Sequence, residues 1–150
     1  MARTDTDTAL DLVVVLARAH NAVAEHARAH AAEHGLSLGE FAVLEALYHK
    51  GEMLLGELQR KLLVSSGGAT YLVDRLSARG FVERRDHPED RRARHAMLTR
   101  QGRELMDRIW PEHARRLARA VGGVDHAERA ALTGLLRRLG THAEGLESGK

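Results

Sequence analysis

The side chains best suited to chemistry in this chain are the arginines of residues 84–99, which read RRDHPEDRRARHAMLT. Pro88 lies there among polar residues that favour a turn. Residues 81–85 and 94–98, on either side of it, are predicted to form the two strands of a β-hairpin. Guanidinium groups bind phosphate through paired N–H donors. An arginine-tipped hairpin next to a short helix therefore predicts binding to duplex DNA, with the helix in the major groove and the arginines at phosphates or in the minor groove.

The positive charge of the chain is concentrated around this segment. Residues 75–103 hold nine arginines and four acidic residues, a net charge of +5, whereas the whole chain of 150 residues carries +2. A basic centre in a nearly neutral chain fits a polyanionic partner. A solvated charged surface is the alternative explanation.

Two short helices precede the hairpin and are predicted to form a helix-turn-helix. Residues 54–63 give the first, and residues 67–78 give the second, which ends at Gly80. We expect Ala69, Leu72, Val73 and Leu76 to be buried and the opposite face of the second helix to be exposed.

The candidate contacts to DNA lie on that exposed face and at the start of the helix. Ser65 and Ser66 are expected to meet phosphate, because free N–H groups and the helix dipole favour an anion there. Thr70 and Tyr71 could touch base edges or the backbone, although Tyr71 could instead pack against the hairpin. Arg75 is expected to clamp a phosphate, with a contact to guanine as the alternative.

The hairpin supplies a second set of candidates. Arg91 and Arg94 are expected at phosphates, and Asp90 is expected to orient an arginine by a charge-assisted hydrogen bond. Either Arg84 or Arg85 should pair internally with Asp74 or Asp90. The alternative is a solvated hairpin whose charges pair with one another.

Long helices flank this central region. Residues 8–34 show one helical stripe rich in alanine, which allows close approach of another helix, and dimerisation is its natural use. Ser37 with Glu40 predicts a capping box for a helix that ends at Gly51. Thr99 is expected to cap a long helix that Pro111 kinks or interrupts. A last helix should begin after Asp125 and end at Gly140.

Composition and missing motifs exclude several classes of protein. The chain has no cysteine, so disulfides and thiolate chemistry are excluded. No apolar run approaches the ~18 residues that span a bilayer, and the N-terminus lacks the apolar segment of a signal peptide, so we expect a cytoplasmic protein without a membrane partner. No phosphate-binding glycine loop, nucleophile elbow or H-E-x-x-H motif is present, so we expect neither an enzyme nor a cofactor.

Histidines are unusually frequent, ten in all. His26, His30 and His34 recur one turn apart on the first helix, and two such histidines can hold a divalent metal. A solvated histidine-rich face is the interpretation we favour, and no metal site is assigned. His20 lies at the centre of the apolar stripe, where it could be a hydrogen-bonded interface or pocket residue, or make that interface or pocket sensitive to pH.

The order helix, helix, helix-turn-helix, hairpin, long helix, helix resembles the MarR family of winged-helix transcription regulators over nearly the whole chain. The most specific match is Asp90-Arg91-Arg92 followed by Leu98-Thr99 and Gly102, which resembles the Asp-x-Arg and Leu-Thr-x-x-Gly of the family's wing. Within the family, residues 41–51 and 65–74 resemble the branch that contains hydroquinone-responsive repressors.

This resemblance implies a mainly α fold with a small β-hairpin wing, in one domain of 150 residues. Residues 8–34 and 100–145 would form the dimerisation helices, and residues 37–99 would form the winged helix-turn-helix lobe. A homodimer would place its two lobes in successive major grooves of a pseudo-palindromic operator. In the family the arginine of the Asp-x-Arg enters the minor groove, so Arg92 is the residue expected there, and a narrow A·T groove would attract it.

The family resemblance also implies a small, often aromatic effector bound between the dimer helices and the lobe, which loosens the grip on DNA. The candidate ligand-binding residues combine rings with neighbouring apolar side chains, and plain core packing is the alternative for each apolar one: His20, Phe41, Leu44, Tyr48, Met53 and Trp110. The expected function is a repressor released by an aromatic or phenolic ligand. A metal-responsive regulator that uses the helix-one histidines is the alternative function.

Overall fold

The computed structural model describes residues 3–62, 66–86, 89 and 94–147. The helices and strands follow one another along the chain as α1 (Asp5–Glu33), α2 (Leu38–Lys50), β1 (Met53–Leu54), α3 (Leu55–Leu62), α4 (Ser66–Ala78), β2 (Val82–Asp86), β3 (Arg94–Leu98), α5 (Arg100–Ala120) and α6 (His126–Glu147). The predicted fold, mainly α with a small hairpin after a helix-turn-helix, is confirmed.

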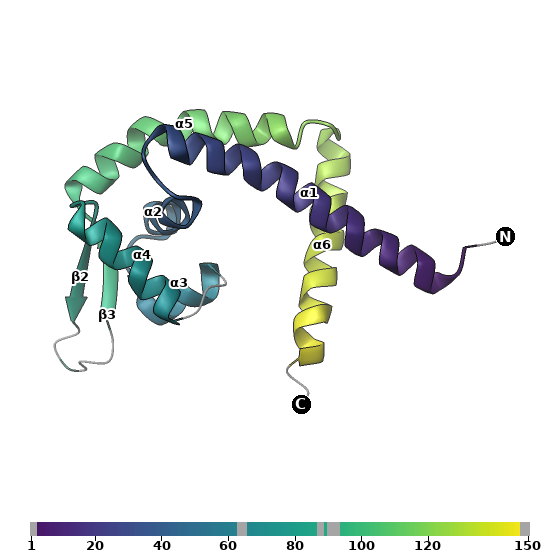
Figure 1. Cartoon of the computed structure of the whole chain (residues 1–150), viewed down its shortest axis with the longest axis horizontal. Helices are drawn as coiled ribbons and strands as arrows, with labels where there is room; N and C mark the ends of the chain where they lie inside the picture. Colours follow the sequence, from purple (N-terminus) through teal and green to yellow (C-terminus); the bar gives the residue numbers. More distant parts are fainter. Residues whose placement is uncertain (1–2, 63–65, 87–88, 90–93, 148–150) are drawn as a thin grey trace.

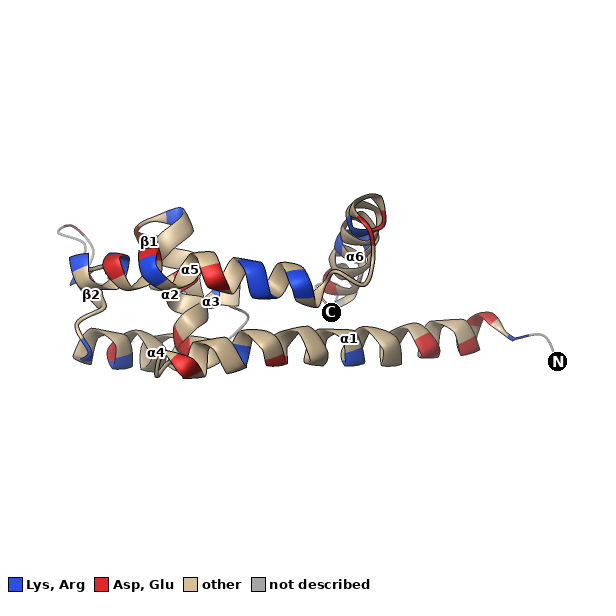
Figure 2. Ribbon diagram, turned by 90° about the horizontal axis from the view of Figure 1, so that it is seen from above, with Lys and Arg blue, Asp and Glu red and all other residues tan. Residues whose placement is uncertain are grey.

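Helices α1 and α5 run alongside each other, and the other elements up to β3 gather at one end of this pair (Figures 1 and 2). Helix α6 turns away from the far end of α5 (Figure 1). The core lies where α2 meets the ends of α1 and α5. Its largest buried side chains include Phe41, Leu44 and Leu47 of α2 with Met106 and Ile109 of α5, each at most 1% exposed.

Short polar motifs set the helix ends, mostly where expected. Ser37 and Glu40 form the predicted capping box of α2, and Thr99 accepts a hydrogen bond from the Gly102 N–H at the start of α5. Helix α1 begins three residues earlier than predicted, because Thr4 and Asp7 form a capping box of their own.

The sheet has three antiparallel strands in the order β1-β3-β2. In the hairpin, Val82 pairs with Leu98 and Asp86 with Arg94. Strand β1 was not predicted: Met53 and Leu54 pair with Ala96 and His95 of β3, and two residues are too few to show a strand periodicity.

The interruption expected at Pro111 as an alternative to a kink does not occur, and the predicted end of the last helix is wrong. Helix α5 continues through Pro111 from Arg100 to Ala120, so the proline does not interrupt it. Proline removes one intrahelical hydrogen bond, and the burial of Ile109 and His113 on either side holds the helix together. Helix α6 likewise passes Gly140 and ends at Glu147, since a helical glycine costs only about 1 kcal/mol relative to alanine.

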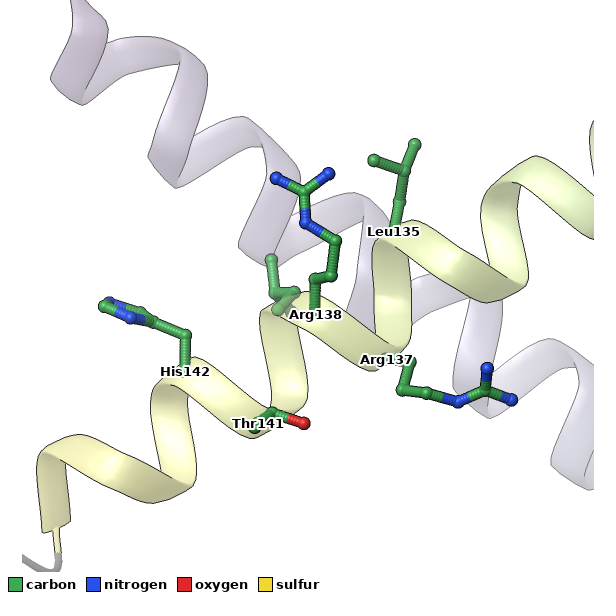
Figure 3. Close-up of a pocket in the computed structure, with 6 residues that line it drawn as sticks. Leu135, Arg137, Arg138, Thr141 and His142 are labelled. Carbon is green, nitrogen blue, oxygen red and sulfur yellow. The ribbon is translucent and has the colours of Figure 1, made fainter.

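Large apolar side chains remain exposed on α1 and α6. On α1 they are Leu10, Leu12, Val13, Val14 and Val15, and on α6 they are Leu132, Leu135, Leu136, Leu139 and Leu146. Leu135 and Arg138 point to the same side of α6, beside a shallow hollow that Leu139 also lines (Figure 3). Among the described residues, no helix is both long and apolar enough to cross a membrane.

Candidate nucleic-acid interface and effector site

Helix α4 buries one face in the lobe and exposes the other. Ala69, Val73 and Leu76 are at most 1% exposed, as predicted, whereas Leu72 is only partly buried. On the outer face, Tyr71 is 60% exposed. The Arg75 guanidinium lies 5.7 Å from the centre of the Tyr71 ring, and its Nη1 is 3.4 Å from the Tyr71 hydroxyl. The pair forms an exposed aromatic and cationic surface on the helix predicted to enter the groove.

A buried carboxylate holds α4 against the rest of the lobe. Glu40 is 3% exposed and accepts hydrogen bonds from the Ser37 N–H at 3.2 Å and from Arg79 at 3.1 Å. Arg79 also donates to the Gly35 carbonyl, and Arg75 Nε lies 3.9 Å from the same carboxylate. Burial acts to raise the pKa of Glu40, but the hydrogen bonds from Ser37 and Arg79 and the charge of Arg75 outweigh it and lower that pKa. From the sequence, Glu40 was expected only to cap a helix, so this second role was missed.

The hairpin lies beside α4 at the same end of the molecule (Figure 1). Arg84 donates to Asp74 of α4 at 2.6 Å, which is one of the four internal pairings that were left open. Arg94 begins β3, is about half exposed, and its Nε lies 3.8 Å from Asp86. Thr70 lies partly buried on α4.

Several predicted DNA contacts cannot be placed. Ser65, Asp90, Arg91 and Arg92 lie outside the described residues, and Ser66 is placed only as the first residue of α4.

Two of the six candidate effector residues, Tyr48 of α2 and Trp110 of α5, form an aromatic contact between these helices. The Tyr48 and Trp110 rings lie 6.4 Å apart, and both side chains are partly buried. The Tyr48 hydroxyl donates to Asp107 at 2.8 Å, and this hydrogen bond raises the pKa of Tyr48. Behind them, Phe41 and Leu44 are at most 1% exposed and belong to the core.

The other two candidates lie apart from the rings. Met53 reaches the same core from strand β1 and is 5% exposed. His20 is exposed on α1, although it was expected on an interface or in a pocket.

The interpretation of the helix-one histidines as a solvated face is wrong for His30. Its side chain is 1% exposed, and its Nδ1 lies 3.0 Å from Nδ1 of His113 on α5. His113 is equally buried and stacks on Phe41 with ring centres 4.1 Å apart. His34 lies 3.4 Å from His30 through their Nε2 atoms, whereas His26 is exposed as expected.

Burial keeps the two inner histidines neutral. Desolvation, then the charges of Arg116 and His34, lower the pKa of His30. Desolvation, with His30 and Arg116, lowers the pKa of His113 to about 4. A sequence signal existed for this burial: His30 follows Ala27 of the alanine stripe by three positions, and so lies at the edge of the packed face.

On the solvent side of the same junction between α1 and α5, Arg116 forms an ion-pair network with two glutamates. Arg116 of α5 donates to both carboxylate oxygens of Glu33, at 2.6 and 3.0 Å, and to Glu112 at 3.0 Å. These hydrogen bonds lower the pKa of both carboxyls and raise that of Arg116. Figure 2 shows the basic bands on this half of α5 alongside α1.

This arrangement defines a class of protein. Helices α3 and α4 form a helix-turn-helix, a β-hairpin follows directly, and the exposed face of α4 carries Tyr71 and Arg75. The chain is a winged-helix DNA-binding protein.

Comparison with known proteins places it within that class. Residues 34–93 match the profile of the MarR family. The chain is 41% identical over 142 residues to the HTH-type transcriptional regulator YkoM of Bacillus subtilis, covering 95% of this chain and 92% of YkoM. It is 37% identical to the B. subtilis regulator MhqR, covering 93% of this chain and 96% of MhqR. The chain belongs to the MarR family and is a transcription regulator, not an enzyme.

A solved structure supports the same placement. BpsR of Bordetella bronchiseptica, whose DNA binding is regulated by 6-hydroxynicotinic acid, superimposes with a TM-score of 0.76 and 27% identity. The superposition covers 86% of this chain and 92% of BpsR.

Proposed function

We propose that this protein is a homodimeric repressor that binds a pseudo-palindromic operator and is released by a small aromatic or phenolic ligand. The observation that carries the DNA-binding part is the Tyr71–Arg75 pair on α4, exposed to solvent and backed by the buried Glu40. Because Arg75 is held by its neighbours, it loses less side-chain entropy on binding phosphate than a free arginine would.

Two elements share the contacts to DNA in this proposal. Helix α4 enters the major groove, and the wing reaches phosphates and the minor groove, where Arg92 is the inserted residue. The proposed contact residues are Ser65, Ser66, Thr70, Tyr71, Arg75, Asp90, Arg91, Arg92 and Arg94.

The dimer follows from the exposed apolar faces of α1 and α6. Leu135 and Val13 are 57% and 63% exposed in the single chain, and such surfaces are typical of interfaces. Residues 8–34 and 100–145 would pair the two chains, and residues 37–99 would form each DNA-binding lobe.

The effector would bind at the aromatic cluster of Tyr48 and Trp110. Both rings are partly buried, so they can stack on an aromatic ligand. The hydrogen-bonded Tyr48 hydroxyl and Asp107 carboxylate provide polar groups that can bind a phenolic hydroxyl. The regulation of BpsR by a hydroxylated aromatic acid supports this class of ligand. His20, Phe41, Leu44 and Met53 remain candidates around these two rings.

DNA binding is tested by fluorescence anisotropy on a duplex from the gene's own upstream region, over a salt series. We expect tight, sequence-selective and steeply salt-dependent binding. Arg75→Ala and Arg92→Ala should each weaken it by about 1–3 kcal/mol. Arg28→Ala, on the similarly exposed Arg28 of α1, should leave it unchanged. Equal weak binding to the operator and a scrambled duplex would contradict the proposal.

Effector binding is tested through Trp110, the single tryptophan of the chain. A phenol or quinone that binds beside it should change its emission and release DNA over the same concentration range. Tyr48→Phe should weaken both effects. Release of DNA without any change in Trp110 emission would place the effector elsewhere.

A second candidate function is a metal-responsive regulator. The observation in its favour is the grouping of His30, Glu33 and His34 at the C-terminal end of α1. A chelator would then change DNA affinity, whereas the effector-released repressor is indifferent to it.

A further inference from the structure

Three potential metal ligands meet where α1 ends. His30, Glu33 and His34 each offer one ligand atom, and these atoms all lie within 4.8 Å of one another. The Nε2 atoms of the two histidines are 3.4 Å apart. Two nitrogens bound to one tetrahedral zinc ion at about 2.0–2.1 Å lie roughly 3.4 Å apart, so this pair needs little movement to share an ion.

We propose that His30, Glu33 and His34 bind a divalent transition-metal ion, with Zn²⁺ the best fit. Residues 30–34 read HAAEH, which places two histidines one helical turn apart with a glutamate between them. Helical zinc sites use this spacing, because side chains at i and i+4 lie on the same face. Two imidazoles, one carboxylate and a water complete four-coordination.

His113 orients the inner ligand. The hydrogen bond between the Nδ1 atoms of His30 and His113 uses one ring nitrogen of His30 and leaves Nε2 toward His34. A proton on Nδ1 of His30, donated to His113, leaves the lone pair of Nε2 free for the ion. Metal-binding histidines commonly donate their other N–H to such a partner. Stacking on Phe41 fixes the His113 ring.

Arg116 holds the third ligand. It donates to both oxygens of Glu33, and each carboxylate oxygen keeps a further lone pair that can bind the ion. The site is closed at His30, which is 1% exposed, and open at Glu33, whose side chain is 51% exposed, so an ion and its water can enter from solvent.

An ion at this position would stabilise the hydrogen-bonded connection between the end of α1 and helix α4. The site lies just before Gly35, whose carbonyl accepts from Arg79, and Arg79 in turn binds Glu40. An ion that fixes the end of α1 therefore fixes the segment that anchors α4. This effect on DNA rests on the proposed function, whereas binding of the ion does not.

The test is a titration of the chelator-treated full chain with Zn²⁺ by calorimetry, and with Co²⁺ by visible absorption. We expect one ion per chain and the absorption of a four-coordinate cobalt site. His34→Ala and Glu33→Gln should each weaken binding at least tenfold. His26→Ala, one turn earlier on the same helix, should leave it unchanged.

The variants avoid the buried His30, and circular dichroism confirms that each one folds. No saturable binding by the wild-type chain, or equal binding by His34→Ala, would overturn the proposal. An equal loss with His26→Ala would also overturn it, because the ion would then bind a loose histidine surface. The titration uses no DNA, so its failure and the failure of the repressor proposal are distinguishable.

Discussion

The buried side chain of Glu40 connects the start of α2 to α4 within the DNA-binding lobe. It caps α2 through Ser37, and it binds Arg79 and faces Arg75 on α4. A buried carboxylate is tolerated because each of its oxygens has a partner. The residue therefore couples the start of α2 to the helix that is proposed to read DNA.

Replacing this carboxylate tests the coupling. Glu40→Gln should lower the free energy of unfolding by about 1.5–3 kcal/mol, since hydrogen bonds to a charged group are lost. The pKa of Glu40 is lowered in the fold, so its contribution is present above its ordinary value of 4.5 and is lost as the pH falls through the lower folded value. Urea unfolding of the wild type and Glu40→Gln should give free energies of unfolding that differ fully at pH 7. This difference should shrink below pH 4.5.

A matched control is Glu104→Gln on the surface of α5. Glu104 is 60% exposed and pairs with Arg100 one turn away. Loss of its charge should therefore lower the free energy of unfolding by less than about 0.5 kcal/mol at any pH. If Glu40→Gln lowers the free energy of unfolding as little as Glu104→Gln does, the buried network adds no stability.

Among the elements, the sheet and α5 approach each other closely where they join. The Thr99 N–H donates to the Phe81 carbonyl, and the Thr99 hydroxyl donates to the Gly80 carbonyl at 2.6 Å. A Cβ on Gly102 would lie 2.0 Å from the Phe81 carbonyl oxygen. The close approach of α5 to β2 thus requires a glycine in this turn.

Gly102→Ala should accordingly destabilise the fold by about 3 kcal/mol or more, because the backbone at Phe81 has to move. Gly134→Ala in α6 is the control. A Cβ at Gly134 would have open space around it, with no atom within 4 Å, so this variant should stabilise the helix by about 0.5–1 kcal/mol. Thermal unfolding of the two variants distinguishes them, and equal melting temperatures would contradict the packing argument.

For the whole molecule, the unpaired apolar faces of α1 and α6 predict assembly. Leu135→Glu should convert the dimer to a monomer, since a charge on that face cannot be buried without a partner. Light scattering after gel filtration measures the mass directly. The affinity of Leu135→Glu for the operator should fall as well, because a monomer occupies only one half-site.

Thr133→Glu provides the control for this prediction. Thr133 is exposed on α6, and its hydroxyl bonds to the Arg129 carbonyl of the same helix. Two positions along a helix point in nearly opposite directions, so this variant should remain a dimer. A monomeric wild-type chain at micromolar concentration would refute the dimer.

Local motifs made the elements predictable. The capping residues of α2, α5 and α6 and both hairpin strands follow from residues within a few positions of one another. Within the candidate DNA interface, the outward direction of Tyr71 and Arg75 follows from the helical period of the apolar residues. The ion pair Arg84–Asp74 was one of four pairings of Arg84 or Arg85 with Asp74 or Asp90 that opposite charge left open.

Sequence alone thus determined the helices, the hairpin strands, their order and the family, but not strand β1, because caps, periodicity and motif spacing act over short distances. Tertiary structure decided which distant side chains meet. His30 and His113 are 83 residues apart, as are Glu33 and Arg116, and no periodicity joins α1 to α5. Their contact depends on how two helices pack around α2, so the histidine cluster emerged only when the chain was folded.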